Sequence, residues 1–127
     1  MGDFVTPINA AVTDSQSNKI KLFLNSDNAA SSTYLGDDNE NAELVENINF
    51  SDLHQYASVK TLLKMDIEGG ECEFMTQKYI ELLREFKTII FEYHELNETC
   101  CLKSLEKFLN ENNFNYHTWS SFIQVNN

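Results

Sequence analysis

The sequence predicts an α/β fold in which helices flank a mostly parallel sheet. From residue 59 onward, short apolar runs alternate with segments of helical period, in the order strand, helix, strand, helix, strand. The run at 88–94 is apolar over consecutive positions, which is typical of a strand buried on both faces of a parallel sheet. This order implies right-handed crossovers that pack the helices on the sheet. The 127 residues are expected to form a single domain over 1–127.

The first half of the chain predicts further strands around a long polar loop. Residues 4–12 are mostly apolar and suit a strand start or an edge. Residues 19–24 alternate between apolar and charged side chains, the period of a half-buried strand, and 44–50 is again strand-like. Residues 25–43 are rich in Asn, Asp, Ser and Ala and have no period, which predicts a loop that could carry specificity. Ser51 is expected to cap a short helix that follows.

The second half predicts a strand over 59–65 and then an amphipathic helix, whose apolar residues between 75 and 86 fall on one face. A second strand follows at 88–94, and helical spacing continues over 101–112. The aromatic-rich segment 115–125 predicts one or two closing strands.

Charge and hydropathy exclude two classes of partner. Twenty acidic and nine basic residues give a net charge of −11, which repels phosphate backbones and anionic membrane surfaces. The sequence has no apolar run of about 18 residues that would span a membrane, and its N-terminus has no signal-peptide layout. We therefore expect no nucleic acid or membrane partner and a cytoplasmic location.

The three cysteines form an odd number without paired spacing, so neither a disulfide framework nor a zinc site is expected, and a reducing compartment is the simpler assumption. Cys101 lies on the apolar face of its helix, where a small core residue is expected. Glycosylation tripeptides begin at Asn49 and Asn97, but they carry little weight without secretion.

Acidic residues follow two of the predicted strands. Asp66 follows the first, and Glu92 and His94 end the second. Ligands of open α/β sheets bind at the carboxyl ends of strands. If the two strands are neighbours, they lie roughly 5 Å apart, and Asp66 and Glu92 converge with His94 on the same face. Such a set could deprotonate a hydroxyl, hold a divalent metal or steady a cationic group.

The glycines at 69 and 70 allow a tight turn or the close approach of a ligand. Glu71 and Glu73 fit a simpler role, because acidic residues in a first helical turn suit the helix dipole. His54 and His117 are expected in surface or structural positions, outside the site.

These segments resemble a known family. The segment 62–71 reads LLKMDIEGGE and resembles the signature of FkbM-type methyltransferases, in which a strand ends Lys-x-Asp-x-Glu-Gly-x-Glu. The segment 89–94, IIFEYH, is similar to the family's next strand, which ends Glu-x-His. NAAV at 9–12 and the serines at 31–32 are similar to its middle region. The resemblance implies the C-terminal part of a Rossmann-like methyltransferase fold without its first strands and glycine-rich loop, since the sequence has no G-x-G.

The resemblance also implies the chemistry, which is methyl transfer from S-adenosylmethionine to a hydroxyl on a sugar or small metabolite. Asp66, Glu68 and Gly69 would then contact the cofactor, and Asp66, Glu92 and His94 would be catalytic. Without the glycine loop, this chain alone is expected to bind S-adenosylmethionine weakly or not at all, and a divalent metal is a further option.

Two other functions compete with this one. A noncatalytic relative could bind a partner chain through a sheet edge left open by the missing strands. A metal-dependent hydrolase could use Asp66, Glu68, Glu92 and His94 as ligands, although the sequence has no second histidine at ligand spacing.

Overall fold

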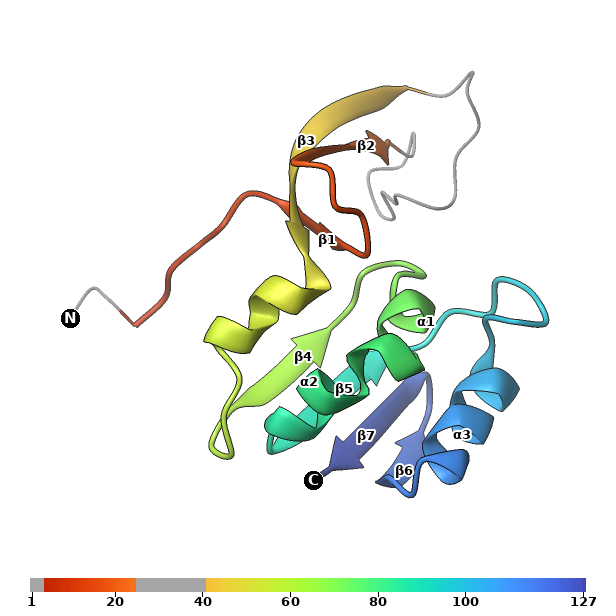
Figure 1. The fold of residues 1–127 in the computed structure, drawn as a ribbon. Helices are drawn as coiled ribbons and strands as arrows, with labels where there is room; N and C mark the ends of the chain where they lie inside the picture. The colour runs from red at the N-terminus through yellow and green to blue at the C-terminus, as the bar shows by residue number, and fades with distance from the viewer. Residues whose placement is uncertain (1–3, 25–40) are drawn as a thin grey trace.

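The computed structural model describes residues 4–24 and 41–127, which form two sheets (Figure 1). The first sheet has the order β1-β3-β2, where β1 is Ala11–Thr13, β2 is Lys19–Phe23 and β3 is Ala42–Asn49. Strand β3 pairs with β1 in parallel and with β2 antiparallel. The strands predicted at 19–24 and 44–50 are confirmed, whereas β3 begins inside the predicted loop 25–43. Residues 25–40 of that loop lie outside the described residues.

The second sheet has the order β4-β5-β7-β6, where β4 is Leu62–Met65, β5 is Thr88–Glu92, β6 is Asn115–Trp119 and β7 is Phe122–Asn126. Only β4 and β5 are parallel; β5 with β7 and β6 with β7 are antiparallel. The prediction of a mostly parallel sheet was therefore wrong, and the fold is mixed α/β. The reason is the connection between β6 and β7, because two residues can only return the chain antiparallel.

The helices are short. They are η1 (Phe50–Gln55), α1 (Glu71–Phe74), η2 (Gln77–Tyr79), α2 (Ile80–Glu85) and α3 (Leu102–Glu111). The single helix expected between 75 and 86 is broken, because Met75 leaves the helical region with φ −79° and ψ 63° and Thr76 is extended. Asn49, rather than Ser51, caps η1. In the described part of the chain, no helix is long and apolar enough to cross a membrane.

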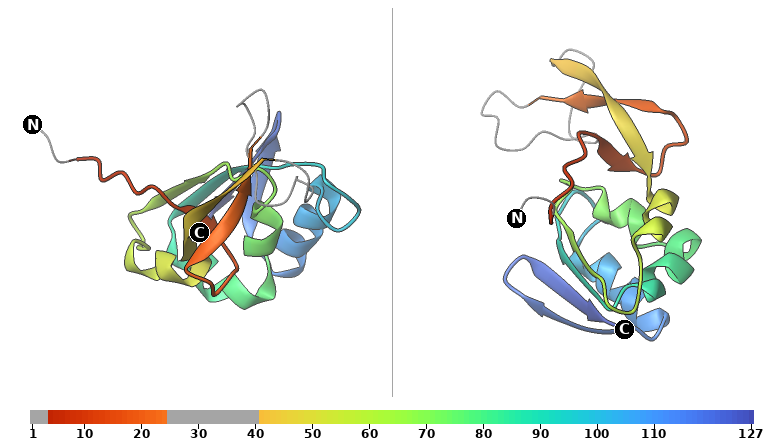
Figure 2. Two further views of the ribbon diagram at one scale, coloured as in Figure 1. Left: turned by 90° about the horizontal axis from the view of Figure 1, so that it is seen from above. Right: turned by 90° about the vertical axis from the view of Figure 1, so that its left-hand side faces the viewer.

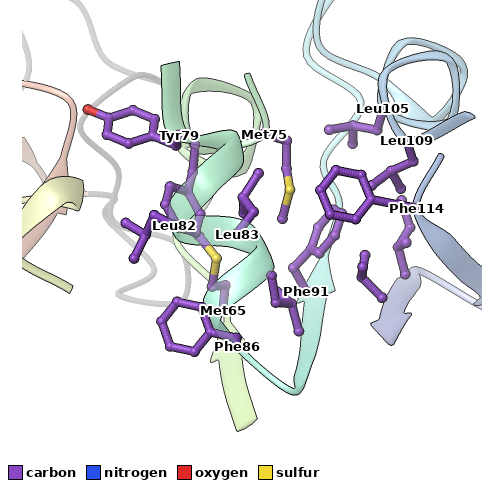
Figure 3. Packing of buried hydrophobic residues seen from close by; sticks show 14 of the residues in the cluster. Met65, Met75, Tyr79, Leu82, Leu83, Phe86, Phe91, Leu105, Leu109 and Phe114 are labelled. Carbon is purple, nitrogen blue, oxygen red and sulfur yellow. The ribbon is translucent and has the colours of Figure 1, made fainter. Parts of the chain in front are cut away.

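The helices lie on one side of the four-stranded sheet (Figure 2), and the core fills the space between them. Figure 3 shows side chains of α2 and its flanking turns packed against β4 and β5. Along β5, Ile89 and Phe91 are fully buried, whereas Thr88, Ile90 and Glu92 are partly exposed. The expectation of a strand buried on both faces was wrong, because helices cover only one face.

Two residues in particular, each directly after a strand of the three-stranded sheet, contact the helices that cover the four-stranded sheet. Phe50, directly after β3, is fully buried and stacks on Phe74 with ring centroids 4.7 Å apart. Asp14, directly after β1, accepts hydrogen bonds from Lys78 Nζ at 2.7 Å and from the Tyr79 hydroxyl. These bonds, that of Lys78 first, hold the pKa of Asp14 below its usual value.

Candidate functional site

The carboxyl ends of β4 and β5 lie side by side, as predicted. The two strands are parallel neighbours, and Met65 is in register with Phe91. Asp66, the first residue after β4, and Glu92, the last residue of β5, therefore lie at the same edge of the sheet. This pairing brings the loop that follows β4 next to the loop that follows β5.

His94 is the centre of an acidic cluster at this edge. Its Nε2 atom lies 3.2 Å from Glu68 Oε2 and 4.0 Å from Asp66 Oδ1. Its Nδ1 atom lies 3.5 Å from Glu71 Oε2 and is buried without a hydrogen bond. The structure thus brings together Asp66 and His94, which were predicted as catalytic, with Glu68, which was expected to contact the cofactor.

Glu92 has a different neighbour. Its Oε1 atom accepts a hydrogen bond of 3.2 Å from the hydroxyl of Ser121, in the turn between β6 and β7. Glu92 is in register with Phe122, which explains this contact. Among the described residues, Asp66, Glu68 and His94 are the ones whose possible metal-ligand atoms lie within 4.8 Å of one another, and Glu92 is not in this group. A catalytic role for Glu92 stays a prediction.

Glu71 does more than suit the helix dipole, which was the role expected from its position in the first turn of a helix. It lies in that turn, but its side chain is 0% exposed. Its Oε1 atom accepts a 2.8 Å hydrogen bond from the amide of Ile67, and Oε2 accepts a 2.9 Å bond from the amide of Gly69. A buried carboxylate is costly unless it is hydrogen-bonded in this way. Glu71 therefore holds the turn that carries Asp66 and Glu68 and also faces His94. An acidic residue after two glycines was the only sequence signal.

The glycine turn is tight, and this chain itself fills the space that Gly69 leaves. Gly69 has φ +111°, and Glu68 before it has φ 52°, so two successive residues are left-handed. A Cβ atom at Gly69 would lie 2.6 Å from Leu96 Cδ1. The close approach that we expected for a ligand is thus made by Leu96, in the loop after β5. Gly70 has ordinary helical angles at the start of α1.

A disulfide links α1 to the loop that precedes α3, contrary to the expectation from the cysteine count. Cys72 of α1 is bonded to Cys100, which precedes α3, with an S–S distance of 2.01 Å. The pair is 28 residues apart in sequence, so only the fold brings it together. Cys101, expected in the core, is partly exposed at the start of α3 and is the free thiol. A hollow of about 280 Å³ lies beside the disulfide, lined by Gly69, Cys72, Glu73, Leu96, Asn97, Thr99 and Cys100.

The cluster permits two kinds of chemistry. The imidazole of His94 faces Glu71 with Nδ1 and faces Glu68 and Asp66 with Nε2, so it could move a proton at this edge of the sheet. Alternatively, Asp66, Glu68 and His94 each offer one ligand atom for a divalent cation. Both uses need the same Nε2 atom, so they exclude one another.

The other two histidines lie outside this cluster, as expected. His54 is exposed and pairs with Glu85 at 3.0 Å. His117 is exposed on β6 and stacks on Trp119, with ring centroids 5.4 Å apart.

In a comparison with known families, residues 2–116 match the Methyltransferase FkbM domain. Comparisons with curated proteins and with solved structures gave no match. The matched span covers most of the chain and contains β4, β5 and the cluster around His94. This chain therefore belongs to the FkbM methyltransferase domain family.

Proposed function

We propose that this domain takes part in the methylation of a hydroxyl group on a sugar or small metabolite, with S-adenosylmethionine as the methyl donor. Membership of the FkbM family supports a methyltransferase-like function. The observation that carries the proposal is the position of His94, whose ring has Glu71 on one side and Asp66 and Glu68 on the other.

In this proposal His94 is the general base. A hydroxyl oxygen is a weak nucleophile until its proton is removed. The Nε2 atom of His94, on the side of the ring that faces Asp66 and Glu68, accepts that proton, and Glu71 lies beside Nδ1 on the other side. The imidazolium that results lies within 4.0 Å of three carboxylates, which stabilise its positive charge.

The residues of the cluster fit the charged end of the methyl donor. S-adenosylmethionine, when bound, supplies an electrophilic methyl group on a positively charged sulfur. The partly exposed carboxylates of Asp66 and Glu68 suit such a charge. For the nucleoside the fit is poor, because Leu96 fills the space at Gly69 and the sequence has no G-x-G loop. We therefore still expect the chain alone to bind this cofactor weakly.

The test is turnover of a His94→Asn variant, measured as S-adenosylhomocysteine release with a panel of sugars and hydroxylated metabolites, at S-adenosylmethionine concentrations high enough for wild type to turn over despite weak binding. Loss of a general base lowers turnover by about 100- to 10,000-fold. The matched control is His54→Asn, since His54 is an exposed histidine outside the cluster and its variant should keep full turnover. A His94→Asn variant as active as the control would remove His94 as the base.

A divalent metal is the second candidate for the same cluster, supported by the three ligand atoms within 4.8 Å of one another. A metal would occupy Nε2 of His94 and orient the hydroxyl in place of a base. Chelation with EDTA distinguishes the two. If His94 is the base, turnover is unchanged by EDTA. If EDTA abolishes turnover and Mn²⁺ restores it, the metal site replaces the general base as the proposed role of the cluster.

A noncatalytic role in partner binding has one supporting observation. Strand β4 is an edge of its sheet, since β5 is its one neighbour among the described strands, and Leu62 there is 55% exposed. A strand from a partner chain could extend the sheet at this edge. Such a complex would slow amide hydrogen exchange in β4 and leave the opposite edge strand, β6, unchanged.

A further inference from the structure

We propose that Asn97 is the acceptor of an N-linked glycan, added in the same oxidising compartment that forms the disulfide between Cys72 and Cys100. Residues 97–99 read Asn-Glu-Thr and match the acceptor tripeptide. A match of this kind has little value alone, so the proposal depends on the conformation of the tripeptide and on the disulfide next to it.

The acceptor side chain is exposed and well ordered by its neighbours. Asn97 lies on the surface of the loop between β5 and α3. Its Oδ1 atom accepts hydrogen bonds from the Thr99 hydroxyl at 2.7 Å, the Thr99 amide at 2.9 Å and the Cys100 amide at 3.0 Å. The hydroxyl of the third tripeptide residue thus contacts and polarises the acceptor amide. Within the described residues, the Nδ2 atom donates no hydrogen bond, so this atom can react.

The second tripeptide, at Asn49, provides an internal comparison. Asn49 is 8% exposed, and its Nδ2 atom donates to the carbonyl oxygens of Asp14 at 3.0 Å and Ser15 at 3.1 Å. Its Oδ1 atom caps η1. A glycan on Asn49 would break these bonds and separate the three-stranded sheet from η1. The two sites have the same sequence pattern, and only Asn97 is compatible with a modified folded protein.

The disulfide is the independent observation that points to the compartment. Cys100 lies three residues after Asn97 and is bonded to Cys72. Disulfides persist in secreted proteins and in the lumen of the endoplasmic reticulum and are rare in the reducing cytosol. N-linked glycans are surface modifications of proteins on this secretory route. Both features favour an oxidising compartment over the cytoplasmic location expected from the sequence.

The reaction balances without any redox change. A bond forms between Asn97 Nδ2 and the anomeric carbon of a lipid-diphosphate oligosaccharide. The bond from that carbon to the diphosphate oxygen breaks, and the diphosphate leaves with the electron pair. Nδ2 gives up one proton. The glycan would stand three residues beyond His94, beside the hollow that Asn97 and Thr99 help to line.

The first test uses the native protein, purified from the organism that encodes it. Peptides are mapped without reduction, and the glycan is removed by an N-glycosidase in ¹⁸O water, which leaves a labelled aspartate at each occupied position. We expect the label at position 97, none at position 49, and a linked pair of peptides containing Cys72 and Cys100. Native protein that is unlabelled at position 97 would overturn the proposal.

The second test assigns the site. The full chain is sent through the secretory pathway of cultured eukaryotic cells with an appended leader, and mobility is compared before and after N-glycosidase. Wild type, Asn49→Gln and Thr99→Ser should shift, whereas Asn97→Gln and Thr99→Ala should not. Wild type that forms the disulfide but does not shift would contradict the proposal. So would a shift that survives Asn97→Gln, because the glycan would then be elsewhere.

Discussion

The two sheets of this domain are stabilised by different interactions. In the four-stranded sheet, β4, β5 and β7 each bury apolar side chains against the helices, and Ile89, Phe91 and Ile123 are fully buried. In the described strands of the three-stranded sheet, the buried residues are polar, namely Thr13 and Asn49. The candidate site lies on the sheet with the apolar core. Its loops therefore leave a rigid support, whereas the three-stranded sheet depends on side-chain hydrogen bonds and on its contacts with the body.

Those hydrogen bonds are concentrated at the end of β3. The Asn47 side chain accepts from the Thr13 hydroxyl and donates to the carbonyl oxygens of Ser15 and Ser17. Each such bond contributes only about 1 kcal/mol to stability. The burial of one large apolar side chain contributes about 1.5 to 3 kcal/mol. We therefore expect the three-stranded sheet to open before the four-stranded sheet.

The largest effect is expected for Phe91→Ala, at the centre of the core. Phe91 is fully buried, with 0% of its surface accessible to solvent, so truncation of its side chain leaves a cavity. The free energy of unfolding should fall by about 3 to 5 kcal/mol in urea titrations. Leu44→Ala in β3, where Leu44 is 68% exposed, should change it by less than about 0.5 kcal/mol. Equal losses would show that both sheets depend equally on apolar burial.

The next effect is that of the disulfide. It joins residues that are 28 apart in sequence. Closing a loop of this length lowers the entropy of the unfolded chain, which stabilises the folded protein by about 3 to 4 kcal/mol. The double variant Cys72→Ala with Cys100→Ala should lose roughly this much stability in urea under non-reducing conditions. The control is Cys101→Ala, which removes the free thiol and its weak sulfur contacts with Glu98 and Ser104 at the start of α3, and which should lose much less stability. A double variant as stable as this control would contradict the prediction.

Glu71→Ala should have a smaller effect on stability and a local effect on the site. It leaves the amides of Ile67 and Gly69 unpaired in a buried turn, at a cost of about 1 to 3 kcal/mol. Amide hydrogen exchange at Ile67 and Gly69 should become faster. Glu73→Ala is the matched control, because Glu73 lies in the same helical turn but is exposed. Unchanged exchange in the Glu71 variant would mean that this carboxylate does not hold the turn.

The smallest effect is expected for Asp14→Asn, where the three-stranded sheet contacts Lys78 and Tyr79. The hydrogen bond from Lys78, and then that from Tyr79, lowers the pKa of Asp14 below 3.8. A carboxyl with a lowered pKa in the folded state stabilises the fold above its unfolded pKa, and this contribution is lost as the pH falls through the folded pKa. The variant should thus be less stable than wild type at neutral pH. The loss should be small, because the side chains of Lys78 and Asp14 are partly exposed. The difference should shrink as the pH falls below 3.8 and vanish once the pH is below the lowered pKa of Asp14 in the folded state. A difference that persists in acid would exclude the charge as its cause.

Part of the site could be predicted from the sequence. Asp66 and His94 were both expected at the carboxyl ends of neighbouring parallel strands, and the structure places them in one cluster. Glu92 was expected in the same cluster because of the two-residue period of a strand. That period ends with β5 at Glu92, so the chain turns before His94, and Glu92 contacts Ser121 instead.

The sequence alone determined the family resemblance and the approximate places of β2 to β5 and α3, but not the break in the helical segment at Met75 and Thr76. Apolar spacing reports which face of a strand or helix is buried, and this property depends on residues a few positions apart. Only the tertiary structure decided that β7 lies antiparallel between β5 and β6, that Glu71 is buried beside His94, and that Cys72 bonds with Cys100. These features depend on contacts between segments that are distant in the chain, and such contacts leave no period in the sequence.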